Sequence, residues 1–327
     1  YGGVVPSTTG DALLWTANST GNLTSVNDLS GLTTYLTFNT GIAGNVSLSG
    51  NAITLSTNAN STVAGTFTGT VTIGMNLSTG TLANATFGLG TGSRLNLDGV
   101  VSGTLMVVST NGGSVYLNGL NTIAGSRVNN GNAYINTLAN SGVAQSLGPG
   151  SSFNFGFGSA AATGNVIYTG SVAASTNKTW SLGQGTSGRL HNGGFFNDGT
   201  GVVTWAGTQT AVTANVARTF TLGGSNTGDN TWQSAIINNS GTGSPVNLTK
   251  SGAGKWILSG TNTFSGATSI TGGILEIASA GSINSTSGIT INGGHFKYNS
   301  ATALNKPITF TSGTISGTGS IGVAVTA

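Results

Sequence analysis

The stretch Asn247-Leu-Thr-Lys-Ser-Gly-Ala-Gly-Lys-Trp-Ile-Leu-Ser-Gly-Thr-Asn-Thr-Phe-Ser-Gly266 decides the fold of this chain of 327 residues. It holds short apolar strands separated by glycine and asparagine turns, and the next strand follows within Ile270-Thr-Gly-Gly-Ile-Leu-Glu-Ile277. Its central phrase, Leu-x-Gly-x-Asn-Thr at 258–263, also occurs at 117–122 and 222–227. Such units bury their apolar faces only against their neighbours, so the phrase predicts a coil stacked on itself.

Short strands recur along the whole chain. Each alternates apolar residues with Thr or Ser over about four positions, as at 35–38, 52–55, 71–73, 114–117, 179–182, 219–222 and 289–292. Glutamate occurs once, and no stretch has the helical spacing of apolar residues. Strands this short without helical crossovers cannot form a sheet of βαβ units. The sequence therefore predicts an all-β fold: a single-stranded right-handed parallel β-helix (β-solenoid) with essentially no α-helix and rungs of about 20 to 25 residues.

Residues 218–277 resemble the autotransporter-associated β-strand repeats of large bacterial surface and secreted proteins. The resemblance is carried by Leu248, Lys250, Gly252, Gly254, Trp256, Leu258, Gly260, Asn262, Thr263, Phe264, Gly266, Gly272, Gly273 and Leu275. Residues 314–321 and 38–55 are similar to other segments of the same proteins, more weakly. The resemblance implies a parallel β-helix outside a bacterial cell. It carries over no catalytic residue, because the repeat is a scaffold.

The composition excludes several classes of function. Only 5% of the residues are charged and the net charge is +3, against about 25% charged residues in an average soluble domain. Lys and Arg are scattered singly, so we expect no nucleic-acid partner. No apolar run approaches about 18 residues, so we expect no membrane span. The absence of Cys fits an exported bacterial protein. Weak charge repulsion between copies permits close self-association.

We expect one continuous β-solenoid over residues 1–327, with the strongest repeat match at 218–327. The best candidate for a subdivision is Leu147-Gly-Pro-Gly150, which is followed by an aromatic–glycine run at 153–158. We interpret it as a wide turn inside one solenoid. Because the chain begins at Tyr1 and not at methionine, we expect a processed mature form.

The supply of catalytic groups is small. The acids are Asp11, Asp28, Asp98, Asp198, Asp229 and Glu276, whereas glycoside hydrolysis needs two facing carboxylates. Asp198 and Asp229 are the nearest candidates, but both lie in turn signatures, so we expect solvent-facing turn roles. His191 and His295 have no partner at metal-ligand spacing, so we expect surface or turn roles for them too. The sequence predicts no catalytic residue, no cofactor and no metal site, and therefore no enzyme.

Four tryptophans follow a regular spacing. Trp180, Trp205, Trp232 and Trp256 are separated by 25, 27 and 24 residues. Such spacing could place the indoles in a lengthwise ladder. We interpret the ladder as filling of the core, and an exposed platform for sugar rings is the alternative.

The functional prediction depends on the composition of the two end segments of the chain. Solenoid ends normally need polar caps, whereas residues 1–6 and 308–327 carry no charge. We therefore predict a subunit of a self-assembling bacterial cell-surface filament, an extracellular homopolymer joined by strand pairing. The candidate contacts are Tyr1, Val4, Val5, Pro6, Leu14, Trp15, Ile315, Ile321, Val323 and Val325. The alternative is a surface adhesin or passenger domain that binds glycans or cells; a polysaccharide lyase or hydrolase is less favoured.

Overall fold

The computed structural model describes residues 9–15, 21–38, 42–56, 63–80, 82–157, 161–184, 188–323 and 325–326. Backbone proximity divides the chain into two compact units, residues 1–137 with 142–150 and residues 138–141 with 151–327. They are called the first and the second unit below. No helix of membrane-crossing length and hydropathy occurs in the described ranges. That one solenoid continues through residues 147–150 stays a prediction.

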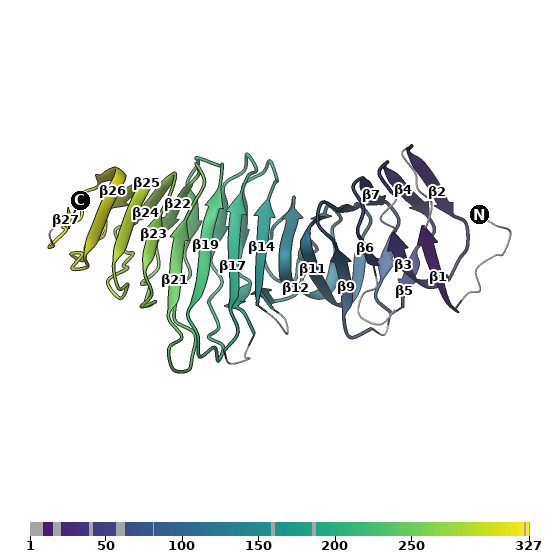
Figure 1. The fold of residues 1–327 in the computed structure, drawn as a ribbon, viewed down its shortest axis with the longest axis horizontal. Coiled ribbons are helices and arrows are strands. Elements are labelled where there is room, and N and C mark those ends of the chain that lie inside the picture. Colours follow the sequence, from purple (N-terminus) through teal and green to yellow (C-terminus); the bar gives the residue numbers. More distant parts are fainter. Residues whose placement is uncertain are drawn as a thin grey trace. The chain divides into compact units, whose positions relative to one another are not determined.

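The first unit contains strands β1 to β12 (Figure 1). Their bounds are β1 (Thr9–Trp15), β2 (Leu23–Asn27), β3 (Thr33–Phe38), β4 (Val46–Gly50), β5 (Ile53–Leu55), β6 (Val63–Gly65), β7 (Thr70–Ile73), β8 (Leu77–Ser78), β9 (Ala85–Leu89), β10 (Arg94–Leu97), β11 (Val101–Leu117) and β12 (Thr122–Ile135).

The second unit contains strands β13 to β27. Their bounds are β13 (Ser152–Phe155), β14 (Ala162–Tyr168), β15 (Ala174–Thr176), β16 (Thr179–Leu182), β17 (His191–Asn197), β18 (Val203–Trp205), β19 (Arg218–Gly224), β20 (Asn230–Trp232), β21 (Val246–Lys250), β22 (Lys255–Leu258), β23 (Thr268–Ile270), β24 (Ile274–Ile277), β25 (Ile289–Tyr298), β26 (Ile308–Ser316) and β27 (Val325–Thr326).

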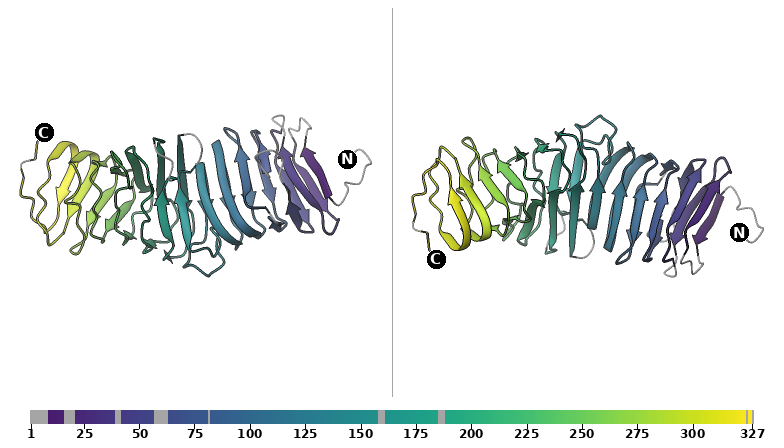
Figure 2. Two further views of the ribbon diagram at one scale, coloured as in Figure 1. Left: turned by 90° about the horizontal axis from the view of Figure 1, so that it is seen from below. Right: turned by 90° about the horizontal axis from the view of Figure 1, so that it is seen from above.

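Parallel pairing between strands that are not consecutive makes each unit a coil. In the first unit β2 pairs with β4, β4 with β7, and β7 with β10, all in parallel. In the second unit β14, β17, β19 and β21 pair in the same way and lie side by side in Figure 1. In Figure 2 the colours within each unit progress steadily from earlier to later residues, as successive rungs require. Because the chain circles the core between paired strands, the prediction of an all-β parallel β-helix is confirmed; the described residues contain no helix.

Alternation of burial along each strand places the core inside the coil. In β21, Val246, Leu248 and Lys250 are buried, and the two residues between them are half-buried. In the first unit Val46, Val71, Leu95 and Val115 occupy one inward column, each at most 1% exposed. Period-two alternation is what a sheet with one buried face requires.

The four tryptophans fill the core of the second unit. Trp180, Trp205, Trp232 and Trp256 are at most 1% exposed, so filling of the core is confirmed and an indole platform for sugars is wrong. The single lengthwise ladder is also wrong. Trp205 and Trp232 pair in register, but Trp256 pairs with Asn230, two residues away from Trp232. Trp180 pairs instead with β13, in another column, because the rungs differ in length and equal spacing does not preserve register.

The asparagine of the recurring phrase joins neighbouring rungs. Asn121 is fully buried; its Oδ1 accepts a bond from the Val101 amide (2.7 Å), and its Nδ2 donates to the Ser146 carbonyl (2.7 Å). Asn262 is 2% exposed and connects three rungs in the same way. Asn226 is half-buried and donates to carbonyls of the preceding turn. The phrase recurs because an amide can both donate to and accept from backbone at buried turns.

Two glycines of the repeat are required by backbone geometry. Gly252 and Gly273 have φ angles of 68° and 57°, in the left-handed region. A Cβ on Gly273 would also overlap the carbonyl oxygen of Gly254 in the preceding rung. Glycine tolerates both conditions because it has no side chain.

Candidate functional site

The predicted contacts near the C-terminus lie in or beside the last strands of the second unit. Ile315 is half-buried in β26, and Ile321 forms a parallel bridge with Leu304. Val323 is half-buried, and Val325 in β27 is 45% exposed. These residues are thus accessible in part, and their role as contacts between copies stays a prediction.

The predicted contacts near the N-terminus are described only in part. Tyr1, Val4, Val5 and Pro6 lie outside the described residues. The backbone around Leu14 and Trp15 belongs to β1, which pairs in parallel with β3. This strand is therefore an integral rung of the first unit, whereas the C-terminal candidates belong to the second.

Asp198 and Asp229 bind different partners. Asp198 is exposed, and its Oδ1 accepts bonds from the amide (2.9 Å) and hydroxyl (3.0 Å) of Ser225. The side chain of Asp229 is 74% exposed and pairs with Lys255 at 2.6 Å. The predicted solvent-facing turn roles are confirmed.

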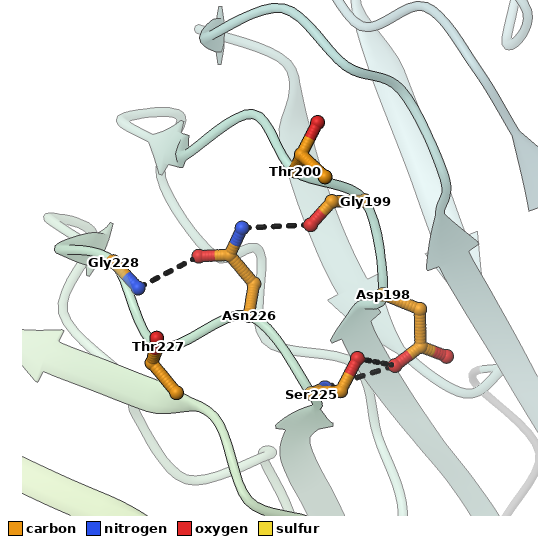
Figure 3. A pocket seen from close by; sticks show the side chains of 7 residues that line it. All are labelled: Asp198, Gly199, Thr200, Ser225, Asn226, Thr227 and Gly228. Atoms are coloured by element: carbon orange, nitrogen blue, oxygen red, sulfur yellow. Dashed lines mark hydrogen bonds between the residues drawn. The ribbon is translucent and has the colours of Figure 1, made fainter.

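A shallow hollow of about 380 Å³ lies beside Asp198 (Figure 3). Its lining consists of Asp198, Gly199, Thr200, Ser225, Asn226, Thr227 and Gly228. The polar groups bind one another: Asn226 Nδ2 donates to the Gly199 carbonyl (2.7 Å), and Asn226 Oδ1 accepts from the Gly228 amide (2.9 Å). The hollow therefore lies between two turns of adjacent rungs that are hydrogen-bonded to each other.

Positive and negative side chains alternate across four successive rungs of the second unit. Lys255 Nζ lies 2.6 Å from Asp229 and 2.9 Å from Glu276, and Lys297 Nζ lies 3.2 Å from Glu276. Asn299 Nδ2 also donates to Glu276 at 2.9 Å. Burial opposes ionisation of Glu276, but the bonds from Lys255, Lys297 and Asn299 hold its pKa below the usual value. The two lysines and the two carboxylates of this network balance in charge, and their bonds connect neighbouring rungs.

The two histidines occupy strands. His191 is fully buried in β17, and its Nδ1 accepts a bond from the Gln184 amide at 3.3 Å. The predicted surface or turn role is therefore wrong for His191, because strand alternation turns this residue inward. His295 lies on the outer side of β25, 2.7 Å from the Ser316 hydroxyl. Within the described ranges, no cluster of three or more His, Asp or Glu that could hold a metal occurs.

Two lysines are buried in the second unit. Lys178 and Lys250 are fully buried, and burial lowers the pKa of each to about 8. Lys250 Nζ donates to the carbonyls of Ser251 (2.8 Å), Gly252 (3.0 Å) and Gly272 (3.0 Å). These carbonyls favour the ammonium form, but the loss of hydration outweighs them. Lys250, the lysine of the repeat, thus hydrogen-bonds to the turns of two rungs.

We expect the protein to become more stable as the pH rises from about 8 towards 10. An unfolded lysine keeps its proton up to about 10.4, whereas the folded ones release theirs near 8, so the unfolded state binds more protons in this window. The thermal midpoint, followed by circular dichroism, should therefore rise between pH 8 and 9.5. Lys250→Met should weaken this rise, and Lys306→Met, at a half-buried lysine, is the control. A midpoint that falls over this range would contradict the assignment.

One outer column of the first unit ends in two tyrosines. Successive pairings of β2, β4, β7, β10, β11 and β12 align six outward residues, one in each rung. They are Thr24, Ser47, Thr72, Asn96, Tyr116 and Tyr134. The adjacent column contains Arg94, which pairs with Ser114, and Ser114 pairs with Asn132. These two columns are called the tyrosine face.

The aromatic end of this face is tightly organised. The Tyr116 and Tyr134 rings stack with centroids 4.3 Å apart and planes 6° apart. Arg94 Cζ lies 3.8 Å from the Tyr116 centroid, and its Nε donates to Asn96 Oδ1 at 3.1 Å. Arg94 is exposed, and both tyrosines are half-buried. Burial is the main cause that raises the pKa of Tyr116, so its hydroxyl stays protonated at neutral pH.

Sequence reasoning did not identify this cluster. Arg94, Tyr116 and Tyr134 each occupy an outward position in an alternating strand, which the sequence does show. Their juxtaposition depends on register: Asn96 and Tyr116 are 20 residues apart, whereas Tyr116 and Tyr134 are 18 apart. A fixed rung length would have misplaced one of them.

Comparison with known proteins agrees with the architecture. Residues 248–277 match the passenger-associated-transport-repeat family, which confirms that the chain carries autotransporter-associated repeats. An alignment of 180 positions, which covers 52% of the chain, shows 35% identity to the adhesin BmaC autotransporter of Brucella suis biovar 1 (strain 1330). The matched stretch spans 5% of that relative. No solved structure matches this chain.

Proposed function

We propose that this chain is part of the passenger of a bacterial surface adhesin and acts outside the cell. The observation that carries the proposal is the 35% identity over 180 residues to a protein described as an adhesin autotransporter. The passenger-associated repeat at 248–277 and the β-helical fold support it. A solenoid displays the outward residues of every rung on long, regular faces, which suits binding better than catalysis. On this proposal the chain is a binding module and not an enzyme.

The proposal is tested by attachment. Beads coated with residues 1–327 should attach to animal or bacterial cells more strongly than beads coated with the same amount of serum albumin. Soluble chain added in excess should compete for that attachment. Attachment no stronger than that of the albumin beads would contradict an adhesive function. Antibody labelling of intact source cells tests the location, because an internal protein would stay unlabelled.

A second candidate function is that of a filament subunit, and a specific strand edge favours it. β26 pairs with β25 along most of its length, but with β27 only at Ile308 and Thr309. In the described part of the chain, residues 310–316 have no strand on their second side. Such an edge pairs through backbone hydrogen bonds with a further strand, which comes from the same polypeptide or, on the filament proposal, from another copy.

Electron microscopy tests the filament candidate. The purified chain at high concentration should form filaments, and removal of residues 313–327 should abolish them. Thr311→Pro is a more local change, because proline removes one backbone donor from β26. A chain that stays monomeric at high concentration would leave adhesion as the only proposal.

A further inference from the structure

The tyrosine face can recognise a ligand only through its side chains. β10 lies between β7 and β11, and the pairings on both sides use its backbone. A peptide therefore cannot add to the sheet here as an extra strand. The groups that face outward here are hydroxyls, amides, two tyrosines and the Arg94 guanidinium.

Arg94 provides an unbalanced positive charge on this face. Among the described residues, the salt bridges involve Lys255 and Lys297 but not Arg94. Asp98, the acid closest in sequence, accepts a bond from Asn118 Nδ2 at 2.7 Å. Stacking on Tyr116 and the bond to Asn96 fix the plane of the guanidinium while its remaining donors stay accessible. A fixed, planar guanidinium suits bidentate binding of a carboxylate.

The neighbours of Arg94 suit sugar hydroxyls. Ser114 follows it in its own column, and Thr72 and Asn96 precede the tyrosines in the other. Asn96 Nδ2 donates to Thr72 Oγ1 at 3.1 Å, which leaves the Thr72 hydroxyl hydrogen and the second Nδ2 hydrogen of Asn96 as donors for a ligand. These groups repeat from rung to rung, about 4.8 Å apart. Tyrosine adds a large rigid contact surface with a polar end at a small entropic cost. One guanidinium among neutral groups is too little charge for a phosphate backbone, which is bound through many cations.

We propose that the tyrosine face binds a carboxylate-bearing polysaccharide, with Arg94 pairing to a uronate carboxylate and the Tyr116–Tyr134 stack supporting the adjacent sugar. The hydroxyl and amide column from Thr72 to Asn96 hydrogen-bonds to sugar hydroxyls further along the same chain. This inference rests on the proposed adhesive function, for which it names the ligand class. It involves only residues of the first unit.

The test measures binding of the full chain to immobilised polygalacturonate, alginate and hyaluronate, with dextran as the neutral polysaccharide. We expect binding to at least one acidic polymer and at least tenfold weaker binding to dextran, because the charge-assisted bond is lost. Added salt should weaken the acidic binding. Absence of binding to all three acidic polymers, or equal binding to dextran, would overturn the inference.

Matched variants locate the site. Arg94→Gln and Tyr134→Ala should each weaken binding about tenfold, with Arg94→Lys intermediate because it keeps the charge but loses the planar fork. Arg189→Gln is the control, because Arg189 is an exposed arginine of the second unit. Unchanged thermal midpoints would show that the variants fold. Equal losses in Arg94→Gln and Arg189→Gln would mean binding by net charge, and the site would be wrong.

Bead attachment separates this inference from the proposed function. If the wild-type and Arg94→Gln beads attach to cells equally and no acidic polymer binds, the ligand assignment fails while adhesion stands. If acidic polymers bind through Arg94 but the beads attach to no cell, adhesion fails while the binding site stands.

Discussion

Trp232→Ala is expected to destabilise the second unit more than any other single truncation in its core, by about 3–5 kcal/mol. The Trp232 ring is fully buried, with centroids 5.1 Å from Trp205, 5.0 Å from Phe220 and 5.2 Å from Trp180. Its removal leaves a cavity among rigid rings that cannot easily close. Denaturant unfolding followed by circular dichroism measures the loss. A change below about 1 kcal/mol would show that the rings repack.

Phenylalanine substitutions separate ring packing from hydrogen bonding. Trp256 Nε1 donates to the Gly223 carbonyl at 2.8 Å, whereas Trp232 Nε1 is buried without a partner in the described residues. Trp256→Phe should therefore cost about 1 kcal/mol more than Trp232→Phe. Ile257→Ala, at the half-buried residue beside Trp256 in β22, is the control and should cost less than any change of the two indoles.

The repeat phrase was sufficient to predict the kind of fold. Short alternating strands, glycine turns and the absence of helical spacing leave a coil as the solution that buries every strand. The asparagines that mark the phrase are the residues that bond neighbouring rungs, as at Asn121. Local sequence thus contained both the strands and the chemistry of their turns. The solvent-facing turn roles of Asp198 and Asp229 could be predicted from their turn signatures, and the structure confirms these roles.

The outer faces could not be predicted because they depend on register. Phe195 follows its partner Val166 by 29 residues, whereas Thr268 follows Leu248 by 20. Insertions of several residues at the turns change which outward side chains become neighbours without disturbing the alternation of the strands. For this reason the regular tryptophan spacing suggested a ladder that the register breaks.

Burial of charged groups was the second feature that the sequence concealed. Lys250 belongs to the repeat, yet only the structure shows its ammonium enclosed by three carbonyls. Arg218 is buried in a comparable way, with Nη1 2.7 Å from the Leu182 carbonyl and Nη2 3.0 Å from that of Gln184. With so few acids in the chain, carbonyl oxygens of the turns take the place of carboxylates as partners for buried cations.

Asn262→Asp is expected to destabilise the second unit by about 3–5 kcal/mol at neutral pH, because it places an unpaired charge in a buried site. Asn262 Oδ1 accepts from the Ile236 amide at 2.8 Å, a bond that a carboxylate can keep. Its Nδ2 donates to the carbonyls of Gly260 (2.9 Å) and Ser282 (2.9 Å), where a carboxylate oxygen would face two acceptors. Asn262→Ala should cost about 1–3 kcal/mol, from unpaired groups without the charge.

Acidification distinguishes these two variants. Burial and the two facing carbonyls should raise the folded-state pKa of the introduced carboxyl above its unfolded value of about 3.9, so the folded state binds a proton more readily. The stability of Asn262→Asp should therefore recover in part as the pH falls from 7 to 5, whereas that of Asn262→Ala should not. Asn305→Asp, at an exposed asparagine, is the control for added charge and should stay close to wild type at both pH values. Equal stability of Asn262→Asp and Asn305→Asp at pH 7 would mean that the repeat asparagine does not hold the rungs together, and the physical reason given for the recurring phrase would be wrong.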